Sequence, residues 1–193
     1  KGVVVASLVN QTGFYIGDET GIIAVACSGE TLAEMELGHE VVIEGTKIHR
    51  KKDAAGAYAG QIVINDAKLV VNLYGNHEYS KESFITDKDL KYIYDLPGTE
   101  DHSAEVYVVK GLIEIVESAY YTNINIKSED GKTTLGLYCS SAKQYNWLKE
   151  FQGKVVTLEI APVNWNGKDY YRGCVIAATD GEKTLVNNLN FAN

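Results

Sequence analysis

The feature that most constrains the fold of this chain is a degenerate internal repeat. Residues 1–75 show three short apolar segments, a helical insertion and two further apolar segments, and residues 103–193 show the same order. Three blocks match between the two copies: 24–27 with 135–139, 37–43 with 151–157, and 58–64 with 171–176. Several matches in one order are rare by chance, so we predict two copies of one small domain.

The composition favours β-structure in both copies. The 193 residues are enough for one large domain or two small ones, and they include 13 Tyr and 18 Gly but only 2 Pro. Aromatic and β-branched residues are typical of strands, and Gly marks the turns between them. We therefore predict a mainly β protein with domains at 1–75 and 103–193.

An acidic segment, residues 76–102, separates the two copies. It carries 3 basic and 7 acidic residues, half of the formal net charge of -8. A helix is expected at about 87–95, with Thr86 as its cap, because Leu90 and Ile93 then share one face and Pro97 follows. We interpret this segment as a solvated linker helix, and we expect the two domains to contact one another through it.

Five strands with a helix between the third and fourth is the layout of the OB-fold barrel. Residues 13–25 resemble the strand two to strand three signature of bacterial OB-fold domains, and residues 38–45 resemble the start of strand four. The second copy keeps a Gly-Lys-Val-Val block at 153–156 but has Tyr120 and Tyr121 where the first has its Gly-Phe-Tyr-Ile block. The resemblance covers residues 2–71 well and 104–191 less well. It implies two five-stranded Greek-key OB-fold barrels in tandem, each with a short helix between strands three and four, joined by a short helical linker.

The resemblance also implies a ligand face across strands two and three, between the loop joining strands one and two and the loop joining strands four and five. In the first copy this face carries Phe14, Tyr15, Arg50, Lys51, Lys52 and Tyr58. A basic loop beside aromatic rings suits backbone contact together with base stacking. The alternative interpretation is a solvated hairpin tip, with Phe14 in the barrel core.

In the second copy the same face carries Tyr121, Asn123, Asn125, Trp165, Lys168, Tyr170 and Arg172. Trp165 falls at a turn next to an Asn-Gly pair, and a large aromatic residue at an exposed tip favours binding. The alternative is that its ring covers a barrel end. Arg50 and Arg172 are the only arginines, and the repeat places both in or beside the hairpin of strands four and five.

No residue pattern for catalysis, a metal or a cofactor stands out. The four His residues are far apart, the three Cys residues have neither disulfide nor zinc spacing, and no phosphate-binding glycine loop is present. We therefore expect a protein that is not an enzyme and uses no cofactor and no metal.

Two functions follow from these observations. The first is a non-catalytic protein that binds single-stranded nucleic acid through its OB-fold faces, a reading that the net charge of -8 opposes. The alternative is an extracytoplasmic protein- or carbohydrate-binding module of a bacterial surface protein. The chain begins at Lys1, which favours an extracytoplasmic or lipid-anchored location after removal of a leader. No segment has the apolar length of a transmembrane span.

Overall fold

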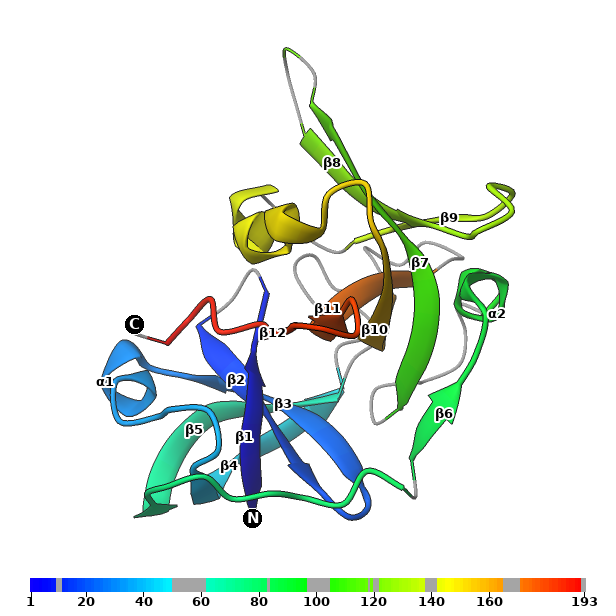
Figure 1. Cartoon of the computed structure of the whole chain (residues 1–193). Helices are drawn as coiled ribbons and strands as arrows, with labels where there is room; N and C mark the ends of the chain where they lie inside the picture. Colours follow the sequence, from blue (N-terminus) through cyan, green and yellow to red (C-terminus); the bar gives the residue numbers. More distant parts are fainter. Residues whose placement is uncertain are drawn as a thin grey trace.

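The computed structural model describes residues 1–9, 12–49, 62–82, 84–96, 105–117, 119, 122–137, 142–164 and 171–191. The protein is mainly β and consists of a closed five-stranded barrel and a second sheet (Figure 1). The first half contains β1 (Gly2–Ser7), β2 (Gly13–Asp18), β3 (Gly21–Cys27), α1 (Gly29–Leu32), β4 (Glu40–His49) and β5 (Ile62–Leu73). The second half contains β6 (Ile85–Asp87), α2 (Leu90–Tyr94), β7 (Val106–Glu117), β8 (Thr122–Lys127), β9 (Thr134–Gly136), η1 (Ala142–Phe151), β10 (Val155–Asn164), β11 (Tyr171–Thr179) and β12 (Thr184–Val186).

The barrel of the first half has the strand order β1-β2-β3-β5-β4 and closes by pairing β4 with β1. All pairs are antiparallel except β3 with β5, which run parallel. Helix α1 lies between β3 and β4, and the hydroxyl of Ser28 caps it by accepting a hydrogen bond from the Thr31 N–H at 3.2 Å. This arrangement is consistent with an OB fold.

The second half forms a sheet of order β12-β11-β10-β7-β8-β9, with β6 added parallel to β7. The antiparallel pairs β7–β8, β8–β9, β7–β10 and β10–β11 correspond to those of the barrel. Where the barrel has its parallel β3–β5 pair, this half has one parallel bridge between Leu137 and Gly173. The described residues thus contain one closed barrel and a second sheet, and the second closed barrel predicted from the sequence is not confirmed.

The linker differs from its predicted form. Helix α2 has five residues, and the carboxylate of Asp89 caps it by accepting a hydrogen bond from the Tyr92 N–H at 2.8 Å. Thr86, the predicted cap, belongs instead to β6, where it pairs with Tyr107. Pairing with β7 takes these residues out of the helix, so the helix starts later than expected.

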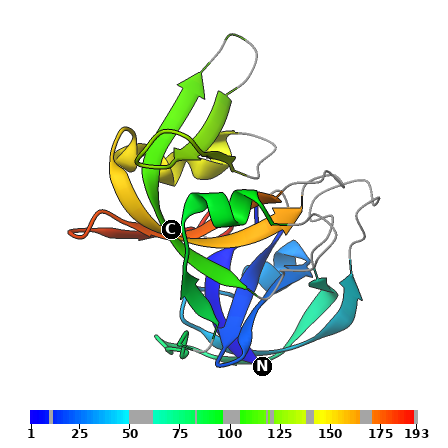
Figure 2. The same ribbon diagram turned by 90° about the vertical axis from the view of Figure 1, so that its right-hand side faces the viewer.

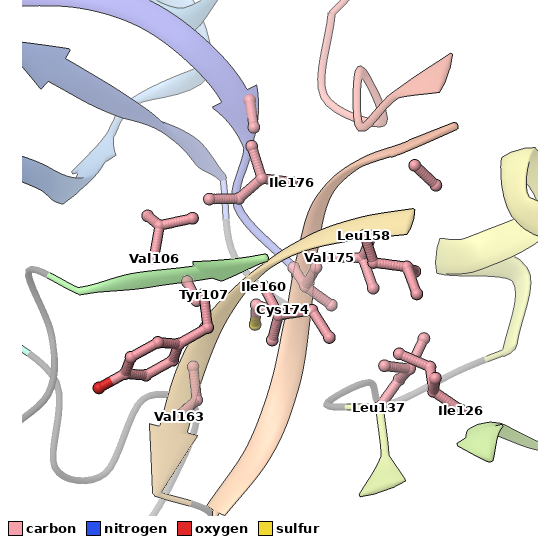
Figure 3. Close-up of a cluster of buried hydrophobic side chains, with 14 of the residues drawn as sticks. Val106, Tyr107, Ile126, Leu137, Leu158, Ile160, Val163, Cys174, Val175 and Ile176 are labelled. Carbon is pink, nitrogen blue, oxygen red and sulfur yellow. The ribbon is translucent and has the colours of Figure 1, made fainter. Parts of the chain in front are cut away.

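The buried apolar side chains of the described residues form two clusters. One lies inside the barrel and includes Phe14, Ile16, Val25 and Val41. The other contains residues of both halves, and Figure 3 shows its part around β10 and β11, with Ile160, Cys174 and Ile176 labelled. Because this second cluster extends from one half into the other, the two halves form one packed unit (Figure 2).

Direct contacts between the halves involve β1, β11 and the segment after β12. The Ser7 N–H donates to the Asn187 carbonyl at 2.8 Å, and the Asn187 N–H donates to the Ile176 carbonyl at 2.9 Å. Asn190 donates from its side chain to the carbonyls of Leu8, at 3.0 Å, and Gly13, at 2.7 Å. The sequence led us to expect contact through the linker helix. Its residues Leu90 and Ile93 do belong to the shared cluster, but the two halves also contact each other directly.

Candidate functional site

The outer face of β2 and β3, where the resemblance puts a ligand, is covered in the first half. Successive residues of a strand point to opposite sides, so Phe14 and Ile16 point into the barrel and Tyr15 points outward. The outward residues Tyr15, Ile22 and Ala24 belong to the apolar cluster shared with the second half. Tyr15 is 1% exposed and Phe14 is 0% exposed. Both rings predicted to stack on a ligand are therefore core residues: Phe14 lies inside the barrel, and the second half packs over Tyr15.

Eight of the other predicted residues, in the basic loop and around the predicted tip, lie outside the described residues: Arg50, Lys51, Lys52, Tyr58, Tyr121, Trp165, Lys168 and Tyr170. Asn123 and Arg172 are described, and both lie in the second half, on β8 and β11. The site is therefore built from this half.

The outer face of β8 and β9 is open and polar. Ile124 and Ile126 point inward and are buried, so Asn123 and Asn125 point outward together with Lys127. On β9, Thr134 pairs with Lys127 and Gly136 pairs with Asn125. We call this surface the β8–β9 face and define it as Asn123, Asn125, Lys127, Thr134 and Gly136, together with Arg172 beside them.

Arg172 lies across β9 at Gly136. A Cβ atom at Gly136 would be 3.7 Å from both Cζ and Nη1 of the guanidinium group. Nη1 donates a hydrogen bond to the Leu137 carbonyl at 3.4 Å. The guanidinium group therefore packs within van der Waals distance of the outer side of the strand at Gly136. Arg172 is partly buried there, which restricts its rotamers.

Among the described residues, the β8–β9 face carries two cations, Lys127 and Arg172, and the carboxylate of Glu114 lies beside Lys127. Nζ of Lys127 lies 2.5 Å from Oε1 of Glu114 on β7. Both side chains are about one-third exposed, at 36% and 29%. Arg172 carries a second positive charge at Gly136, the cross-strand neighbour of Asn125. The face therefore offers hydrogen-bond donors and acceptors together with the cationic groups of Lys127 and Arg172.

Lys127, Thr134 and Gly136 are the residues of this face that sequence reasoning missed. The alternation of polar and apolar residues over 121–126 is a signal that extends to Lys127. Thr134 had no such signal, because its place beside Lys127 depends on the register of β8 and β9.

The described residues offer few groups for metal binding or for thiol chemistry. No three His, Cys, Asp or Glu side chains in that part of the chain gather as metal ligands. Burial raises the pKa of the Cys27 thiol to about 11, which keeps it protonated at neutral pH. In the same residues no helix is long and apolar enough to cross a membrane.

Comparison with known proteins gives no family. No protein-family model matches the chain. No curated protein matches it significantly. A solved structure of a murine DNA-binding protein bound to double-stranded DNA is 12% identical, with 97% of this chain and 98% of that chain covered and a TM-score of 0.41. A similarity of this size carries no argument about function.

Proposed function

We propose that this chain is a non-catalytic binding protein that takes single-stranded nucleic acid across the β8–β9 face of a second OB-like barrel. The observation that carries the proposal is the difference between the halves. The equivalent face of the first half is buried around Tyr15, whereas the β8–β9 face is open and has Arg172 across Gly136. OB folds commonly bind ligands on strands two and three, which are β8 and β9 here.

The chemistry of the face suits a single strand. The ammonium group of Lys127 and the guanidinium group of Arg172 can donate hydrogen bonds to phosphate oxygens. Arg side chains also stack on planar rings. The amides of Asn123 and Asn125 each offer a donor and an acceptor for base edges. The pairing of strands in this half supports a barrel-like face, since the Leu137–Gly173 bridge joins the third and fifth strands as in the closed barrel.

The net charge of -8 limits the expected affinity. Repulsion between the acidic surface and phosphates weakens non-specific binding, so we expect Kd values in the micromolar range at low salt. The predicted aromatic residues Tyr121, Trp165 and Tyr170 remain candidates for base stacking.

Fluorescence anisotropy with a labelled single-stranded 15-mer, titrated at low and at physiological salt, tests the proposal. Arg172→Gln is expected to weaken binding about tenfold, because it removes charge-assisted hydrogen bonds. Lys127→Gln is expected to reduce the slope of log K against log salt by about 0.7, the value for one lost phosphate contact. Lys68→Gln, an exposed change of the same charge on β5, serves as the control. The proposal is contradicted if the oligonucleotide does not bind the wild type at low salt. It is also contradicted if the wild type and the three variants bind it equally.

An extracytoplasmic module that binds a protein or carbohydrate is the second candidate. The end of β5 and the residue after it favour a protein partner, because Val70, Val71, Leu73 and Tyr74 are 42% to 71% exposed. Digestion of intact cells by an added protease would test the location. Protection of the chain in intact cells, with cleavage after lysis, would exclude a surface module.

A further inference from the structure

An exposed apolar strip lies on the outer side of the paired strands β4 and β5. Val41 of β4 is buried inside the barrel, so its neighbour Val42 points outward, and Val71 of β5 pairs with Val42. Leu73 points to the same side as Val71, because it lies two residues further along the strand. Val70 lies beside them, where the register of the two strands shifts. We call Val42, Val70, Val71 and Leu73 the β5 strip.

The β5 strip leaves more apolar surface uncovered than a single exposed residue would. Three of its four side chains, those on β5, are 42% to 57% exposed. The other exposed Val and Leu side chains of the described residues belong to three separate segments, which are β7, the start of β10 and the chain after β12. Contiguous apolar surface marks an interaction site more often than scattered residues do. The strip is therefore the apolar surface of this chain that is best suited to a protein contact.

The charged residues in register with the β5 strip carry both signs. Glu44 on β4 pairs with Lys68 on β5, and both side chains are exposed. Within the described chain neither of these two side chains has a hydrogen bond or an ion pair. At the other end of the strip Glu40 pairs with Leu73, and Nζ of Lys1 lies 3.0 Å from the Glu40 carboxylate. Two cations and two carboxylates thus flank the strip, although the chain as a whole has a net charge of -8.

This pattern is self-complementary about a two-fold axis. An axis that runs parallel to the strands, in front of the strip, lays β5 of one copy over β4 of a second copy. Val71 then faces Val42 of the second copy, and Lys68 faces Glu44 of the second copy, and the axis makes each contact twice. The apolar pairs exclude water. The two ion pairs favour this register because opposite charges meet in it.

We propose that the β5 strip is the interface of a dimer formed by two copies of this chain. Acidic proteins repel their own copies over most of their surface, so a contact between copies needs a face on which the charges balance. The β5 strip is such a face. It is smaller than the about 800 Å² per partner that a stable dimer buries, so we expect a reversible dimer with a Kd of about 10–100 µM.

The dimer interface and the β8–β9 face are independent surfaces. Strands β4 and β5 lie at the opposite end of the molecule from β8 in both ribbon views (Figure 1, Figure 2). A second copy on the β5 strip therefore leaves the β8–β9 face open. The dimer and the proposed binding of a nucleic acid can each fail without the other.

Sedimentation velocity at protein concentrations from about 5 to 500 µM tests the dimer. The wild type is expected to change from mostly monomer to mostly dimer over this range. Val71→Asp puts a charge at the centre of the strip and is expected to raise the Kd at least about tenfold. Val155→Asp is the matched control, because Val155 is also 42% exposed but lies on β10 in the other half. An equal loss in this control overturns the inference. A wild type that stays monomeric also overturns it and leaves the strip to a partner of another kind.

Charge reversal tests the two-fold arrangement itself. Lys68→Glu and Glu44→Lys each bring like charges together in both symmetric contacts, so each is expected to raise the Kd about tenfold. The variant that combines both changes restores opposite charges between the copies, and its Kd is expected to return to within about threefold of wild type. These exposed changes keep the barrel core, so they test the interface even if Val71→Asp does not fold. Single variants that dimerise like the wild type, or a combined variant as weak as the singles, overturn the inference.

Discussion

Asn187 is the residue whose replacement tests the connection between the two halves most directly. It is 1% exposed and follows β12. Its Nδ2 group donates hydrogen bonds to the carbonyls of Ser7 on β1, at 3.2 Å, and Val175 on β11, at 3.5 Å. Its Oδ1 atom accepts a hydrogen bond from the Leu189 N–H at 3.2 Å. Asn187→Ala removes these three bonds but leaves the backbone bonds of the residue in place.

The expected loss follows from the burial of these partners. A neutral hydrogen bond contributes about 0.5–1.5 kcal/mol net, and a buried carbonyl left without its partner costs about 1–3 kcal/mol. Ser7 is 0% exposed, so its carbonyl has no direct access to bulk water. We expect Asn187→Ala to lower the free energy of unfolding by about 2–4 kcal/mol.

Urea denaturation followed by circular dichroism measures the effect. With a slope near 2 kcal/mol per molar urea, the midpoint is expected to fall by about 1–2 M. One transition should move as a whole, because one apolar cluster joins both halves. Asn65→Ala is the control, since it removes an exposed hydrogen bond to Asp66, and its expected effect is below about 0.5 kcal/mol. A loss below about 0.5 kcal/mol for Asn187→Ala, or two transitions of which only one moves, would refute this reasoning.

Three further predictions concern single groups. A Cβ atom at Gly17 would lie 2.5 Å from the Tyr79 ring, so Gly17→Ala is expected to lower the free energy of unfolding by about 1–3 kcal/mol in the same urea assay. A hydrogen bond from Lys154 holds the pKa of Asp180 at about 2, below its unfolded value near 3.9. The stabilising effect of Asp180 is therefore present above about pH 4 and lost as the pH falls towards 2, and the urea midpoints of wild type and Asp180→Asn should converge there. Since burial raises the pKa of Cys27 to about 11, iodoacetamide at pH 8 should modify it at least about tenfold more slowly than a free cysteine, as measured by peptide mass spectrometry.

Each of these three predictions has a result that would contradict it, and the first has a matched control. Gly29→Ala has no heavy atom within 4 Å of the new Cβ and should be close to neutral. A normal stability of Gly17→Ala would mean that the Tyr79 ring does not rest on β2. Midpoints of wild type and Asp180→Asn that stay apart at pH 2 would contradict the depressed pKa. Fast modification of Cys27 in the folded protein would show that its thiol is not desolvated.

Patterns in short segments were sufficient for much of the architecture. The order of five strands with a helical insertion in each half agrees with the sequence prediction, whereas the short strands β6 and β12 were not predicted. The alternation from Asn123 to Ile126 predicted which side chains of β8 face outward, and burial of Ile124 and Ile126 confirms it. These features depend on residues that are neighbours in the chain, where period and propensity act directly.

The error at Tyr15 has a physical cause that was visible in the sequence. Residues 14–16 and 22–26 are apolar without alternation, a pattern typical of strands that are buried on both faces. The resemblance to OB folds directed attention to a ligand face, although an apolar run predicts that both faces are covered. In the folded chain the second half covers the outer one.

What the sequence specifies locally is a set of strands, their turns and the repeat that orders them, because each depends on residues close along the chain. Which OB-like face is buried and which is open depends on how the halves pack, through contacts such as Asn187 with Ser7 that join residues almost the whole chain apart. Such surfaces arise only when the shared apolar cluster fixes both halves in one arrangement, since burial of that cluster stabilises the whole unit.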